Sequence, residues 1–77
     1  MPTIKRFGST KIRIYGGDHN PPHVHVIGPD FAAQVAIADG EILNGVLPAK
    51  NRLTVLRWMA RNRDELMETW NVLTGRD

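Results

Sequence analysis

All three histidines of this 77-residue chain lie within one short segment, which is the most distinctive chemical feature of the sequence. The segment reads Asp18-His19-Asn20-Pro21-Pro22-His23-Val24-His25. His23 and His25 are two residues apart, so on a β-strand both imidazole rings project from the same face and can converge on one ligand. The two prolines restrict the preceding loop and can direct Asp18 or His19 back toward that face.

A histidine pair of this kind can perform metal-free acid–base chemistry on a phosphodiester. Because imidazole titrates close to neutral pH, one ring can act as the base while the other acts as the acid. If the preceding strand lies beside the histidine strand, Lys11 and Arg13 would hold the phosphate group. We therefore predict a ribonuclease site whose candidate catalytic residues are His23, His25, Asp18 and His19, and whose candidate substrate-binding residues are Arg13 and Lys11.

The same segment allows two other interpretations. His23 and His25, with His19 or Asp18 as a third ligand, would suit Zn²⁺, Fe²⁺ or Mn²⁺. However, Gly17 and the two histidines reproduce only the opening of the first cupin metal motif, so no cofactor is our primary expectation. In the other interpretation the segment is purely structural, with both histidines on the solvated side of a sheet.

A second cluster of candidate functional residues lies on the expected first helix. At about 100° per residue, the side chains of Lys50, Arg57 and Arg61 fall on one face, and Trp58 lies beside them. Such an edge either binds an acidic partner or RNA, or is a solvated helix face. Lys50, Arg57, Trp58 and Arg61 are the predicted partner-binding residues, and a chain this small can also gain stability from a second copy.

The composition predicts one soluble globular domain over residues 1–77. The 42% hydrophobic and 23% charged shares are ordinary for a folded domain, and no stretch reaches the roughly 20 apolar residues of a membrane span. With no cysteine and no apolar leader segment, we expect a cytoplasmic protein that does not bind membranes. Ten Lys and Arg against eight Asp and Glu leave a net charge of +2, which is low for an RNA-binding protein.

The elements that must position these residues indicate an α+β fold. We predict a small antiparallel sheet of four to five short strands over about residues 3–45, packed against two C-terminal helices at about 48–61 and 63–74. The strands are expected at 3–7, 11–15, 23–27, 31–38 and 41–45. The dipeptide Asp39-Gly40 predicts a two-residue type I′ turn between the last two strands.

The sequences of the two expected helices also predict which helix face packs against the sheet. Ala49, Leu53, Leu56 and Ala60 form an apolar stripe on the first helix. Leu66, Trp70 and Leu73 form the corresponding stripe on the second helix. Asn62 followed by Glu65 predicts a capping box at the start of the second helix, and Gly75 predicts its end.

Taken together, these features resemble the bacterial domain of unknown function 4160 family. The resemblance is carried by Met1-Pro2-Thr3-Ile4, the histidine segment, Gly40-Glu41, Gly45-Val46-Leu47-Pro48 and Trp58. Members of that family are small bacterial proteins that are often encoded beside a second small protein, in an arrangement like that of a toxin–antitoxin pair. The resemblance implies a toxin role and a cognate antitoxin-like partner. Gly16-Gly17 departs from the family pattern.

We favour a toxin-like component of a bacterial type II toxin–antitoxin module that acts on RNA through a histidine-based site. The first alternative is a non-enzymatic interaction module that binds a neighbour-encoded small protein. The second is a small histidine-ligated metal protein.

Overall fold

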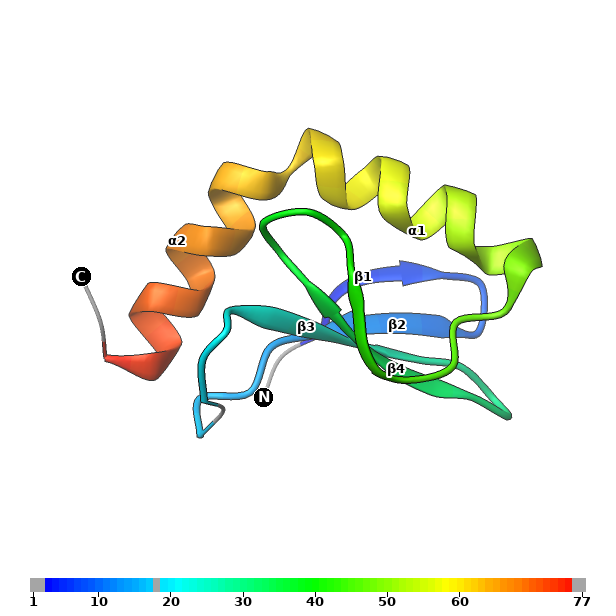
Figure 1. Ribbon diagram of the computed structural model, residues 1–77, viewed down its shortest axis with the longest axis horizontal. Helices are drawn as coiled ribbons and strands as arrows, with labels where there is room; N and C mark the ends of the chain where they lie inside the picture. The colour runs from blue at the N-terminus through cyan, green and yellow to red at the C-terminus, as the bar shows by residue number, and fades with distance from the viewer. Residues whose placement is uncertain (1–2, 18, 76–77) are drawn as a thin grey trace.

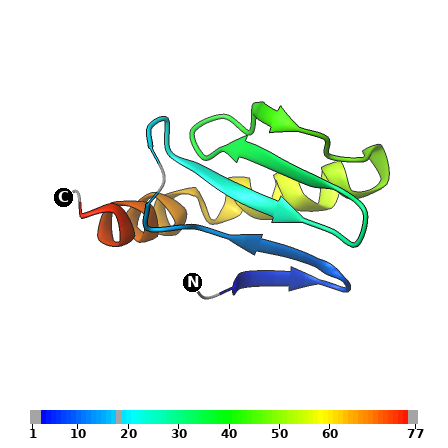
Figure 2. The same cartoon turned by 90° about the horizontal axis from the view of Figure 1, so that it is seen from below.

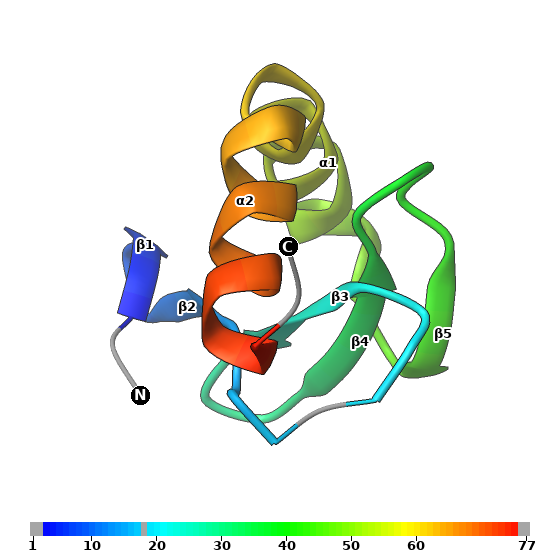
Figure 3. The same ribbon diagram turned by 90° about the vertical axis from the view of Figure 1, so that its left-hand side faces the viewer.

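Five short strands form one antiparallel sheet in the computed structural model, which describes residues 3–17 and 19–75 (Figure 1). The strands lie side by side in chain order, with β1 (Thr3–Phe7) and β5 (Ile42–Gly45) at opposite edges (Figures 2 and 3). Two helices follow, α1 (Ala49–Arg61) and α2 (Arg63–Thr74), and the predicted α+β fold is confirmed. No described helix is both long and apolar enough to span a membrane. The strand bounds are β1 Thr3–Phe7, β2 Thr10–Arg13, β3 His23–Ile27, β4 Ala32–Ala36 and β5 Ile42–Gly45.

The two faces of the sheet differ in polarity because apolar and polar residues alternate along the central strands. Ile12, Val24, Val26 and Val35 are fully buried on the side that faces the helices. The opposite side, which we call the outer face, carries the polar residues that alternate with them. The apolar core therefore lies on the helix side of the sheet.

The turn between β4 and β5 is longer than the predicted type I′ turn. A type I′ turn requires positive φ at both central residues, but of Asp39 and Gly40 only Gly40 has it, at +75°. The Gly40 N–H donates to the Ala36 carbonyl at 2.9 Å. The loop starts early because Ile37 is buried, and its N–H donates to the Pro22 carbonyl at 3.0 Å.

β5 ends in a conformation that requires glycine. Gly45 has φ of +77°, and a Cβ atom at this position would collide with the backbone carbonyl oxygen of Ala32. That carbonyl accepts a hydrogen bond from the Val46 N–H at 3.0 Å, so it cannot move away without losing the bond.

We predict that Gly45→Ala lowers the free energy of unfolding by about 2–4 kcal/mol, because the backbone clash adds to left-handed strain of about 1–2 kcal/mol. Urea denaturation measures the loss. Gly8→Ala is the matched control, since Gly8 also has positive φ, at +61°, but no atom lies within 4 Å of an added Cβ. It should lose only the strain energy, and equal losses in the two variants would contradict the clash.

Helix α1 (Ala49–Arg61) turns a different face to the sheet from the one predicted. Val55 and Met59 are its buried residues, whereas Leu53 on the predicted stripe is 59% exposed. Leu56 is the one member of that stripe that packs against the core. The packed face brings Leu56 and Trp58 against the core together with Val55 and Met59. These four large side chains remove more apolar surface from water than the two leucines and two alanines of the predicted stripe would.

Asn62 is the single residue between α1 and α2 (Arg63–Thr74). Its side-chain Nδ2 donates to the carbonyl of Trp58 at 2.8 Å, and its own carbonyl accepts from the Leu66 N–H at 2.9 Å. The predicted capping by its side chain is therefore wrong, because that side chain ends α1 instead of starting α2. Through these two hydrogen bonds, Asn62 sets the direction in which α2 leaves the end of α1.

Helix α2 packs as predicted. Leu66 and Trp70 are buried and Leu73 is partly buried against the core. Gly75 ends the helix in the left-handed conformation, with φ of +75°. In Figures 1 and 2, α2 lies at the end of the sheet where β3 begins, which brings it close to the histidine strand.

Candidate functional site

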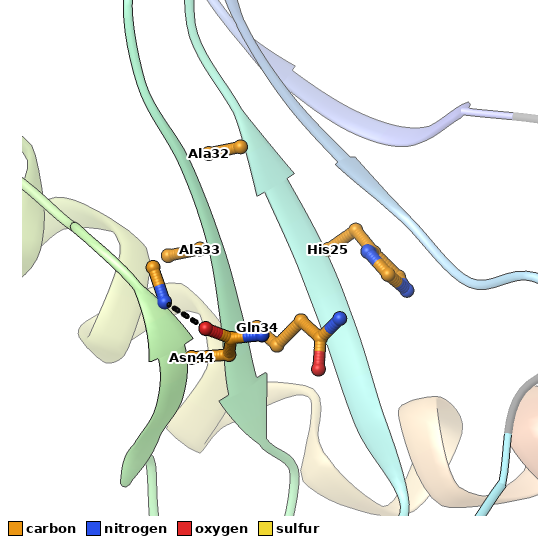
Figure 4. Close-up of a pocket in the computed structure, with 6 residues that line it drawn as sticks. His25, Ala32, Ala33, Gln34 and Asn44 are labelled. Carbon is orange, nitrogen blue, oxygen red and sulfur yellow. Dashed lines mark hydrogen bonds between the residues drawn. The ribbon is translucent and has the colours of Figure 1, made fainter.

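A row of polar side chains crosses the outer face of the sheet. The pairing of β2 with β3 sets Arg13 opposite His25. The next two pairings set Gln34 opposite His25 and Asn44 opposite Gln34. Directly opposed residues of neighbouring strands project to the same face, so four strands each contribute one member to this polar row. Figure 4 shows the Gln34 side chain between Asn44 and His25. The side-chain Oδ1 of Asn44 accepts from the Gly45 N–H at 2.8 Å.

His25 is half-buried and held by an aromatic neighbour. The ring of Tyr15 lies 4.5 Å away between centroids, at an interplanar angle of 80°. This edge-to-face arrangement is the favoured one for aromatic pairs and restricts the rotation of the imidazole. Tyr15 follows the last residues of β2, so the loop after that strand fixes the orientation of His25.

The predicted catalytic role needs an imidazole that the substrate can reach, but His23 is nearly buried, with only 6% of its surface exposed. Its Nδ1 lies 2.8 Å from the carbonyl oxygen of Pro21, which follows a cis peptide bond. Because a carbonyl only accepts, Nδ1 is the donor of this hydrogen bond. The rings of His23 and His25 are 5.2 Å apart between centroids, so the two histidines do form a pair.

Trp70 of α2 supports this pair from the core. Its ring centroid lies 5.2 Å from that of His23, and it is 1% exposed. Its indole nitrogen is buried and has no hydrogen-bond partner among the described residues. Trp70 thus links the packing of the C-terminal helix to the position of His23.

Three cations share the outer face with the histidines. Arg6 of β1 is paired with Lys11 of β2, and Lys11 is paired with Ile27, two residues beyond His25 on β3. The register that the ribonuclease prediction assumed is therefore present. No Asp or Glu occurs in any of the five strands, so the Lys and Arg residues of the sheet are not interspersed with acidic ones.

Two shallow pockets meet at Gln34. The first has a volume of about 160 Å³ and is lined by His25, Ala32, Ala33, Gln34, Asn44 and Gly45. The second has a volume of about 340 Å³ and is lined by His19, Asn20, Pro21, His23, Gln34 and Leu43. Each histidine of the pair therefore borders a different pocket, and a ligand seated over Gln34 would border both.

A family model matches residues 10–71, a segment that contains the whole polar row and both histidines of the pair. The model is that of DUF4160, a domain of unknown function. The chain belongs to the DUF4160 family. The match runs from β2 into α2, and β1 lies outside it. No curated protein and no solved structure matches the chain.

The two predicted third metal ligands of this DUF4160 chain are His19 and Asp18. No group of three or more His, Cys, Asp or Glu side chains within residues 3–17 and 19–75 is arranged to hold a metal ion. His19 is exposed and borders only the second pocket. Asp18, predicted to orient a histidine or to bind a metal, lies outside the described residues.

The predicted partner-binding residues of this DUF4160 chain separate into two groups. Arg57, Trp58 and Arg61 line a common groove beside β1. Lys50 is exposed but does not line that groove. Trp58 is half-buried, with its ring 6.2 Å from that of Phe7 between centroids.

Sequence reasoning missed five residues of this DUF4160 site. Alternation along the strands could have placed four of them on the histidine face, had the pairing of all five strands been assumed; these are Arg6, Tyr15, Gln34 and Asn44. No local signal could have placed Trp70 against His23, because the two residues are 47 positions apart and meet only through tertiary packing.

Proposed function

We propose that this DUF4160 protein is the toxin-like component of a bacterial type II toxin–antitoxin module and that it cleaves RNA without a metal ion. The toxin role is supported by the family resemblance. The chemistry is supported by one observation above all, the position of His25 between Arg13 and Gln34 with the ring of His23 5.2 Å away.

The proposed reaction is transphosphorylation within the RNA backbone. The 2′-oxygen bonds to the adjacent phosphorus, the bond from phosphorus to the 5′-oxygen breaks, and a 2′,3′-cyclic phosphate and a 5′-hydroxyl form. One imidazole takes the proton of the 2′-hydroxyl, and the other, already protonated, gives its proton to the departing 5′-oxygen. No redox step or further reactant is needed.

The surroundings of the histidine pair suit the phosphate group. A phosphodiester over Gln34 borders the pocket of His25 on one side and that of His23 on the other. The Arg13 guanidinium lies on the strand beside His25 and can donate two parallel hydrogen bonds to non-bridging oxygens, which stabilises the charge that develops there.

The distribution of charge supports RNA as the substrate better than the net charge does. Residues 3–17 contain Lys5, Arg6, Lys11 and Arg13 and no acidic residue. Because the field near a surface depends on local charges, β1 and β2 attract a polyanion even in a protein whose net charge is +2.

The proposal is tested by incubating the purified protein with end-labelled single-stranded RNA in the presence of EDTA. We expect products that end in 2′,3′-cyclic phosphate. Arg13→Ala should lower the cleavage rate by about 100-fold, since it removes a donor to the developing charge.

The matched control is Lys50→Ala, which removes one exposed cation far along the chain from the histidine segment and should stay within about twofold of wild type. Intact RNA after prolonged incubation with the folded wild-type protein would refute the proposed activity. Equal losses in Arg13→Ala and Lys50→Ala would refute the specific role of Arg13.

A further inference from the structure

A basic groove that also contains apolar side chains lies between β1 and α1, on the helix side of the sheet. It has a volume of about 410 Å³. Three of its lining residues are cations and none is acidic, while the others are mainly apolar or aromatic. The residues are Lys5, Phe7, Leu53, Thr54, Arg57, Trp58 and Arg61.

The groove runs along an open strand edge. β1 pairs with β2 on one side, and no described strand pairs with its other side. Lys5 is opposite Ile12 and Phe7 is opposite Thr10, both of which are buried on the helix side. The same face of β1 therefore lines the groove, and a strand added to β1 would continue the sheet beneath the basic edge of α1.

We propose that this groove binds an extended acidic segment of a partner protein, which adds to the sheet as a strand beside β1. Its backbone would pair with the open edge of β1, which is the usual source of affinity in strand addition. Successive side chains of a strand alternate between faces, so every second residue would point into the groove. Acidic residues would meet Lys5, Arg57 and Arg61, and an apolar residue between them would contact Leu53.

Several observations favour a peptide over RNA at this groove. A nucleic acid has no backbone of regularly alternating N–H and C=O groups that could pair along a strand edge. The Trp58 ring is half-buried and packs edge-to-face against Phe7, so it is not the exposed flat surface on which bases stack. Leu53 is 59% exposed and lines the groove, so it offers a contact for an apolar side chain of a bound peptide.

The other edge of the sheet offers no such site. β5 pairs irregularly with β4, where the register shifts between Gln34 and Val35. The backbone then turns away at Gly45, whose φ is positive. β5 itself carries no charged residue, so it lacks the electrostatic attraction that the β1 edge provides.

The test uses the full chain labelled with ¹⁵N and titrated with the peptide acetyl-Thr-Glu-Thr-Leu-Thr-Glu-Thr-amide. We expect the shifted resonances to map to β1 and to α1 around Arg57, and we expect amide exchange in β1 to slow. The same peptide with lysine in place of glutamate should not bind.

Substitutions at exposed positions should leave the fold intact, and they test the charged and the apolar contacts separately. Arg57→Glu and Leu53→Ser should each weaken binding by about tenfold or more, whereas Lys50→Glu, a charge reversal on the same helix outside the groove, should not. His25→Ala should bind the peptide like wild type. This result would show that peptide binding in the groove is independent of RNA cleavage. The inference does not rest on the proposed ribonuclease activity.

Several outcomes would overturn the inference. The first is the absence of shifts in β1 at millimolar peptide, and the second is equal binding of the lysine peptide. If the peptide-free chain sedimented as a dimer and its two copies were paired through β1, the edge would be assigned to a second copy. Displacement of the peptide from the groove by oligouridylate would assign it to RNA.

Discussion

Replacing His25 with alanine is expected to reduce RNA cleavage by at least about 100-fold, the range that acid–base catalysis by one side chain contributes. His25 is the more accessible ring of the pair, with Arg13 and Gln34 on the strands at either side of it. Because it is half-buried on the outer face and outside the core cluster, the variant should lose only about 1 kcal/mol of stability or less. Cleavage of labelled RNA and urea denaturation measure the two effects.

The same variant has a cellular readout. Induced expression of the wild-type chain should arrest bacterial growth, and expression of His25→Ala at the same level should not. Lys50→Ala serves as the control that remains toxic. Arrest by His25→Ala would show that toxicity does not depend on this imidazole, and the groove beside β1 would become the region to map.

His23→Ala should behave differently from His25→Ala, although both belong to the pair. His23 is 6% exposed and contacts Trp70, so its removal should lower stability as well as activity. A stability loss in His25→Ala that matched the loss in His23→Ala would contradict this division of roles.

Replacing Trp70 with alanine is expected to have the largest effect on folding. Loss of a buried tryptophan costs about 3–5 kcal/mol, and a small domain has only about 5–15 kcal/mol in total. Most of the Trp70→Ala chain should therefore unfold well below the urea midpoint of the wild type. The residue contacts His23 as well as filling the core, so activity should be lost with the fold.

Trp70→Phe is the conservative control, and the unpartnered indole nitrogen makes its outcome informative. Phenylalanine keeps an aromatic ring beside His23 and removes a buried donor without a partner among the described residues. Removing such a donor relieves a desolvation cost of about 1–3 kcal/mol, which offsets much of the lost packing. If Trp70→Phe were as destabilising as Trp70→Ala, the indole N–H would have to make a stabilising hydrogen bond.

The strand predictions succeeded because they depend on local patterns. The alternation of Val24 and Val26 with His23 and His25 is enough to assign β3 and to put both rings on one face. Turn residues then separate the strands, and strands that are close in sequence tend to pair. These rules account for the meander order of the sheet and for the position of Arg13 beside His25.

The failures have a common physical cause, which is that the outcome depended on contacts distant in sequence. The face of α1 is selected by how much apolar area Val55 and Met59 bury against the sheet, and the helix sequence alone does not show this. The β4–β5 turn is lengthened by the bond from Ile37 to Pro22. The Asn62 side chain can accept from N–H groups at the start of α2 or donate to a carbonyl at the end of α1, and in the structure it donates to the Trp58 carbonyl.

The single-residue joint at Asn62 makes this chain sensitive to length at one point. Each added or removed helical residue rotates the following helix by about 100° and shifts it by about 1.5 Å. One insertion beside Asn62 would therefore carry Trp70 off the core and away from His23, although every residue of the site would still be present. An insertion in the loop before β3 or in the loop after β4 would not rotate a helix in this way. Homologues that vary in length should accordingly do so in those loops, while the distance in sequence from Met59 to Trp70 stays constant.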